Sequence, residues 1–392
     1  MSTLDYRSKT LFLEKDNGIV ENYWPIACDF GYGGCKLYGP NICATFPSYA
    51  QQIDLSSYMG PSSDDIIYKD LDTGAAWIVG KSAQNMMEDN DTDDSMDVLC
   101  GRNRYFTPMF LVLARVSMGI AMLNTINSTH LLTDRVIPVL QTGLPCDYIQ
   151  VDTPILKEAL AGHHRYMIKI GTGKEYCFDF VLPQENINIM PQPMGAFVSA
   201  STDANWIQDV SRFSASSTLI IDPGFHTLDT FSVRSGKPIK KSWGAYGMSK
   251  ILSETSKYIY DNYQTAIPAA AMQKYLETGV FPKKEKKDRR HISTIPVDFT
   301  HILEAKSQEI CEEAMDSVCD YYNDFVGYKY LIITGGTGAA WAHWIIDRLK
   351  DMKTLNVIAG DCPDGMPMYF ANVRGYYSYL KQYLYSLNLQ RK

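Results

Sequence analysis

A short pattern of residues occurs twice in the chain, and it constrains the fold more than any other feature. The first copy is Asp29-Phe-Gly-Tyr-Gly-Gly-Cys-Lys36, and the second is Asp222-Pro-Gly-Phe-His-Thr-Leu-Asp229. In each copy an apolar run ends in an Asp, and a glycine-containing turn follows before a second extended run. Both copies therefore predict a strand, a tight turn and a returning strand. A hairpin repeated in this way indicates two related α/β halves.

The residue types in the two hairpins suit the binding of phosphate. Glycines allow the backbone to approach an anion closely, and the N–H groups of a turn can surround phosphate oxygens. Asp29 and Asp222 would repel a phosphate, so we interpret them as ligands of a Mg²⁺ ion or of its waters. Lys36 places a positive charge near the same oxygens. Each hairpin alone is more often an ordinary turn, but the pair predicts one nucleotide held between the two halves.

Two further segments extend the pattern. Met190-Pro191-Gln192 follows a short strand and begins a predicted helix that could run to about Val210, because prolines favour the first helical turn. The predicted strand 331–333 leads into Gly335-Gly336-Thr337-Gly338 and then into a helix over about 339–350. The order along the chain is therefore hairpin, glutamine at a helix start, hairpin, and a strand with a glycine loop.

This order resembles the actin superfamily of ATPases over most of the chain. The resemblance implies an α/β protein with the actin-like fold, in which two related α/β domains flank a nucleotide cleft. The first domain would comprise residues 1–190, with about 40–104 as a small subdomain, and the C-terminal helix 371–392 would complete it. The second would comprise residues 191–370, with about 236–300 as its small subdomain.

The resemblance also implies which residues form the site, and it implies ATP and Mg²⁺ as the bound groups. The catalytic set would be Gln192, which would position the attacking water, with Asp29 and Asp222, which would hold Mg²⁺ through water. For Asp229 two roles stay open, because it would either bind a metal water or only fix the hairpin. The expected nucleotide-binding residues are Gly31, Gly33, Gly34, Lys36, Gly224, His226, Thr227, Asp229, Gly335, Gly336 and Thr337.

Three segments are most similar to the ParM-type actins that segregate plasmids: Thr-Gly-Leu-Pro at 142–145, Met-Pro-Gln at 190–192 and Ala-Asn-Val-Arg-Gly-Tyr at 371–376. This resemblance implies ATP hydrolysis coupled to the assembly and disassembly of filaments of the protein itself. It also implies a DNA-binding adaptor on a plasmid centromere-like site as a partner. Two alternatives remain, a small-molecule kinase and a non-polymerising scaffold ATPase on the same fold.

Composition limits the other possibilities. The chain has 37 Lys and Arg against 44 Asp and Glu, a net charge of −7, so we expect no direct sequence-specific DNA binding. No apolar run is long enough for a membrane helix, so we expect no membrane partner. The 9 Cys residues are scattered without a C-x-x-C pair, which favours a reducing, cytoplasmic location. We interpret the acidic run 88–97 as a solvated loop, and the basic run 283–291 as a solvated loop or a filament contact.

Overall fold

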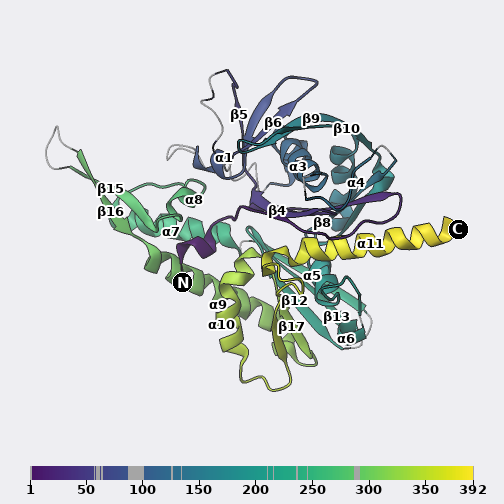
Figure 1. Cartoon of the computed structure of the whole chain (residues 1–392). Helices are drawn as coiled ribbons and strands as arrows, with labels where there is room; N and C mark the ends of the chain where they lie inside the picture. The colour runs from purple at the N-terminus through teal and green to yellow at the C-terminus, as the bar shows by residue number, and fades with distance from the viewer. Residues whose placement is uncertain are drawn as a thin grey trace.

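The computed structural model describes residues 2–56, 58, 62, 65–86, 101–124, 127–133, 135–209, 211–214, 216–234, 237–244, 246–286 and 292–391. The acidic run 88–97 and the end of the basic run, 287–291, lie outside the described residues. Figure 1 shows two bodies of sheets and helices, with helix α11 running along the junction between them.

The first body is built on a six-stranded sheet in the order β1-β4-β3-β2-β8-β11. Strands β2, β3 and β4 form an antiparallel meander, and β8 and β11 continue the sheet in parallel with β2. All residues of β2 are buried because helices cover both faces of this sheet. The strands are Leu11–Glu14 (β1), Tyr23–Phe30 (β2), Gly34–Gly39 (β3), Ile42–Pro47 (β4), Ile137–Leu144 (β8) and Ile187–Pro191 (β11), and the covering helices are Pro108–Ala121 (α3) and Ala371–Arg391 (α11).

The second body repeats this arrangement in a five-stranded sheet, β14-β13-β12-β17-β18. Again three strands form an antiparallel meander, and two parallel strands follow. Both repeated hairpins, β2–β3 and β12–β13, are therefore confirmed, and they occupy equivalent places in two related sheets. The strands are Thr218–Pro223 (β12), Thr227–Arg234 (β13), Lys237–Gly244 (β14), Tyr330–Ile333 (β17) and Asn356–Ala359 (β18), and the main helices are Met248–Tyr263 (α7), Thr300–Tyr321 (α9) and Gly336–Leu349 (α10).

A smaller sheet sits on the first body in the order β10-β9-β6-β7-β5. It takes three strands from within the predicted subdomain 40–104 and two from a later part of the chain. The domain boundaries given above stay a prediction. The elements here are Ala50–Ile53 (β5), Ile66–Asp70 (β6), Ala76–Val79 (β7), Lys81–Asn85 (α1), Ile149–Leu160 (α4), Gly162–Ile170 (β9) and Glu175–Leu182 (β10).

A two-stranded hairpin, β15 (Val280–Lys286) and β16 (Ile292–Asp298), projects from the second body (Figure 1). The loop expected over 283–291 is thus wrong for Lys283, Lys284 and Lys286, which lie in β15. The reason is that β15 pairs along its length with β16, whose Ile, Thr and Val residues favour a strand. The remaining short elements are Thr3–Tyr6 (η1), Arg102–Phe106 (η2), Gln184–Asn186 (η3), Ser211–Ser214 (α6), Met272–Tyr275 (α8), Asn323–Phe325 (η4) and Met368–Phe370 (η5).

Helices α5 (Gln192–Ala200) and α11 lie side by side where the two bodies meet. Glycines allow this approach, since a Cβ on Gly375 would lie 1.7 Å from the carbonyl oxygen of Gly195. Helix α5 ends at Ala200, well before the expected Val210, and the buried guanidinium of Arg374 donates to the carbonyls of Ser199 and Thr202 around this end. These contacts satisfy carbonyls that the helix end leaves without a helical partner. Within the described residues, no helix has the length and apolar character needed to cross a membrane.

Candidate functional site

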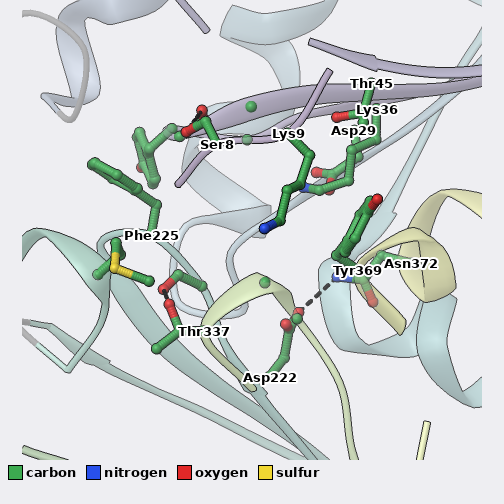
Figure 2. Close-up of a pocket in the computed structure, with 18 of the residues that line it drawn as sticks. Ser8, Lys9, Asp29, Lys36, Thr45, Asp222, Phe225, Thr337, Tyr369 and Asn372 are labelled. Carbon is green, nitrogen blue, oxygen red and sulfur yellow. Dashed lines mark hydrogen bonds and ion pairs between the residues drawn. The ribbon is translucent and has the colours of Figure 1, made fainter. Parts of the chain in front are cut away.

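A cleft opens between the two bodies at the point where β2 and β12 end (Figure 2). Its empty space, open solvent included, is about 920 Å³, which is large enough for a nucleotide. Most of the residues that the sequence singled out line it. These are Asp29, Gly31, Gly33, Gly34, Lys36, Gln192, Asp222, Gly224, Thr227, Asp229, Gly335, Gly336 and Thr337.

The first hairpin brings a carboxylate, an ammonium group and an amide together. Asp29 and Lys36 are opposite each other on β2 and β3, and Lys36 Nζ lies 2.9 Å from Asp29 Oδ2. Burial alone would lower the pKa of Lys36, but the adjacent Asp29 carboxylate outweighs it and raises that pKa. Gln192, the first residue of α5, donates from Nε2 to Asp29 Oδ1 at 3.2 Å. The side chain of Gln192 is thereby held at the cleft wall.

The second hairpin adds two buried carboxylates. Asp222 accepts a hydrogen bond of 2.6 Å from Asn372 Nδ2, and burial raises its pKa to about 7. The neighbouring carboxylates of Asp229 and Asp29 contribute to this rise. Burial also raises the pKa of Asp229 to about 6, although Thr227 and Ser242 donate hydrogen bonds to it. Three acidic groups in one cleft repel one another, so a cation there would be stabilising.

Close contacts explain two of the glycines. A Cβ on Gly33 would lie 2.4 Å from the ring of Phe225, so the tips of the two hairpins touch. Gly335 has a φ of +84°, and a Cβ there would lie 2.3 Å from Asp222 Oδ1. The loop after β17 is also tied to the second hairpin, because Thr337 Oγ1 donates to the carbonyl of Gly224 at 2.6 Å. By contrast, a Cβ on Gly336 would meet nothing within 4 Å.

His226 is the one expected nucleotide-binding residue that does not line the cleft. Its Nδ1 lies 3.3 Å from Ser249 Oγ, and its ring meets the ring of Tyr32 edge to face, with 5.7 Å between ring centres. Tyr32 belongs to the first hairpin, so His226 joins the two hairpin tips beside the cleft. His226 lies in the turn between β12 and β13, where side chains do not follow the regular alternation of a strand, and the sequence motif did not reveal which way its ring points.

Several lining residues were missed by the sequence analysis. Asn372 lies in the segment 371–376 that was used for the resemblance, but its bond to Asp222 joins positions 150 residues apart. Tyr369 and Thr45 line the cleft from the start of the C-terminal segment and from β4. The N-terminal residues 5–9 also line it, and their mixed composition gave no signal.

The residues present fit a Mg²⁺ ion held through its waters. Among the described residues no group of three or more His, Cys, Asp or Glu side chains is placed to hold a metal directly. Asp29 and Asp222 nevertheless face one cleft from its two sides, and the buried Oδ1 of Asn372 has no hydrogen-bond partner among the described residues. An unpaired buried acceptor of this kind suits an ordered water.

Comparisons with known proteins bear on the fold. Residues 27–195 match the family described as "Actin like proteins N terminal domain". The fold is similar to that of a non-polymerisable mutant of the pCBH ParM protein, with a TM-score of 0.69 and 19% identity over 92% of this chain and 100% of that one. It is also similar to a subunit of a 15-stranded ParM filament from Clostridium botulinum, with a TM-score of 0.66 and 19% identity over 92% and 99% of the chains.

An archaeal actin homologue in complex with ADP has a TM-score of 0.61 and 16% identity over 91% of this chain and 99% of that one. A search of curated proteins found no match. The chain therefore has the actin-like fold, and its residues 27–195 match the N-terminal domain of actin-like proteins. Its fold is similar to that of ParM proteins, as the resemblance implied.

Proposed function

We propose that the protein binds ATP with Mg²⁺ in this cleft, hydrolyses it, and assembles into filaments that segregate plasmid DNA through a DNA-binding adaptor. One observation carries the proposal. Asp29 with Lys36 from one half and Asp222 from the other are brought to a single cleft, with Gln192 in contact with Asp29. A cytoplasmic location fits this function.

The chain's own residues would bind and orient the reactants. Lys36 and the backbone N–H groups of the two turns would hold phosphate oxygens, and the loop at Gly335 and Gly336 would lie against the adenosine. The Gln192 amide, fixed by Asp29, would orient a water toward the terminal phosphate, since phosphoryl transfer depends mainly on positioning and charge. When bound, Mg²⁺ would neutralise phosphate charge, and Asp29 and Asp222 would hold its waters.

The contacts of Asp229 favour an ATPase over a kinase. A kinase needs a free carboxylate to accept the proton of the substrate hydroxyl. Both oxygens of Asp229 already accept hydrogen bonds, one from Thr227 and one from Ser242. This arrangement supports the role in which Asp229 fixes the second hairpin.

The contact between the two hairpins would couple nucleotide binding to filament assembly. Because Gly33 and Phe225 meet across the cleft, a nucleotide between the hairpins would set the angle between the two halves. A fixed angle would present one surface for a head-to-tail contact, and a contact of this kind that does not close into a ring generates a filament. The ParM filament among the structural neighbours supports this proposal by its fold.

We expect the protein to polymerise when it is given ATP and Mg²⁺ with no partner and no other substrate. Light scattering, pelleting and negative-stain microscopy would follow assembly, with ADP, no nucleotide and a chelator as controls. A protein that binds ATP but stays monomeric at about tens of micromolar would contradict the filament. Transfer of phosphate to an added alcohol or sugar would instead indicate the kinase.

A further inference from the structure

The N-terminal strap, which we define as residues 5–9, crosses the cleft. Immediately after it, strand β1 pairs with β4 in the sheet of the first half. At its other end, Tyr6 is 3% exposed and packs in the hydrophobic core of the second half. The strap therefore links the two halves, and all five of its residues line the cleft.

Polar contacts fix the strap in place between its two ends. Arg7 Nη1 lies 2.7 Å from Glu277 Oε2 on the second half, and Arg7 Nη2 donates to Asn85 Oδ1 on the first half at 3.0 Å. Ser8 Oγ donates to the carbonyl of Gly33 at the tip of the first hairpin, at 2.6 Å. The strap thus has a defined path past the hairpin that we assign to phosphate.

Of the two cations in the strap, Arg7 has an ion-pair partner and Lys9 has none among the described residues. Its ammonium group donates to the carbonyl of Leu4, and among the described residues no carboxylate lies within ion-pair distance of it. Burial lowers the pKa of Lys9, although the charge of nearby Asp5 raises it. Lys36, by comparison, already pairs with Asp29. Figure 2 shows the Lys9 side chain reaching into the cleft between the first hairpin and Asp222.

We propose that Lys9 binds the phosphates of the nucleotide, so that the N-terminal strap is part of the nucleotide site. The inference rests on the proposed nucleotide binding. A polyphosphate needs more positive charge than Lys36 can offer while it is paired with Asp29. Lys9 supplies a cation in the same cleft without breaking an existing ion pair. Because the strap is anchored on both halves, a phosphate held by Lys9 would also help to keep the cleft closed.

The test compares ligands that differ only in phosphate. Calorimetric titrations of the full-length wild type and of Lys9→Met would use ATP, ADP and adenosine, each at low and high salt. We expect Lys9→Met to weaken ATP binding about tenfold or more, to weaken ADP binding as well, and to leave adenosine binding unchanged. The salt dependence of ATP binding should also be smaller in Lys9→Met, since one charge contact is lost.

Two further variants make the result specific. Lys9→Arg should restore most of the ATP affinity, because it returns the positive charge. Lys350→Met removes an exposed lysine just past the far end of α10, outside the cleft, and should bind ATP as the wild type does. Equal ATP affinity in Lys9→Met and wild type would overturn the role of Lys9. An equal loss for adenosine and ATP would also overturn it, since Lys9 would then act through the fold. A wild type that binds no ATP would instead refute the proposed function.

Discussion

Replacing Gln192 with alanine should slow ATP hydrolysis by about a hundredfold while ATP still binds, because positioning groups at a reacting phosphate typically contribute an effect of this size. The phosphates would keep Lys36 and the two turns, but the attacking water would lose the amide that Asp29 now holds in place. Filaments of Gln192→Ala should therefore persist longer after ATP is added. Phosphate release measured in single-turnover and steady-state assays, with calorimetry for ATP affinity, would test this.

A matched control is Gln184→Ala, which removes an exposed glutamine from the short element before β11. Gln184→Ala should hydrolyse ATP at the wild-type rate. If Gln192→Ala released phosphate as fast as the wild type, Gln192 would have no place in the reaction. If Gln192→Ala bound ATP much more weakly, its role would be in binding.

Changing Asp222 to asparagine should stabilise the empty protein at neutral and higher pH and impair metal-dependent hydrolysis. In the folded protein burial raises the pKa of Asp222 to about 7, whereas an unfolded Asp titrates near 4. Between these values the folded state binds the additional proton, so stability falls as the pH rises through this range. Asp222→Asn does not titrate and escapes that loss. One pKa unit corresponds to about 1.4 kcal/mol, so the shift of about three units gives an expected gain of about 4 kcal/mol at pH 8.

Thermal or urea unfolding of the wild type and Asp222→Asn at pH 5 and pH 8, without nucleotide, would measure this gain. The difference between the two proteins should be about three times larger at pH 8 than at pH 5. With ATP and Mg²⁺ the order should reverse, and hydrolysis by Asp222→Asn should fall by about a hundredfold. Asp347→Asn, at an exposed position of α10, is the control and should change neither quantity. A stability difference independent of pH would mean that Asp222 is ionised in the folded protein throughout this range.

Local patterns were sufficient to predict much of the fold. Both hairpins, the start of α5 at Gln192 and the strand before the glycine loop depend on a few neighbouring residues, whose backbone preferences act over that distance. The repetition of the hairpin then predicted two related sheets, and the structure has them in the same strand order apart from the additional edge strand β1 of the first sheet. The basic hairpin β15–β16 was missed because its strands are fixed by pairing with each other, while their charges suggested solvent.

The sequence by itself determined the two hairpins that we assign to phosphate binding, the glutamine at the start of α5, and the order of these segments along the chain. Only the tertiary structure decided which residues from distant parts of the chain these segments contact. It places Asn372 on Asp222, turns His226 toward Tyr32, and lays the N-terminal strap with Lys9 across the cleft. The physical reason is that a turn is specified by local backbone preferences, whereas contacts between distant segments arise only when the two halves pack together and bury their common boundary.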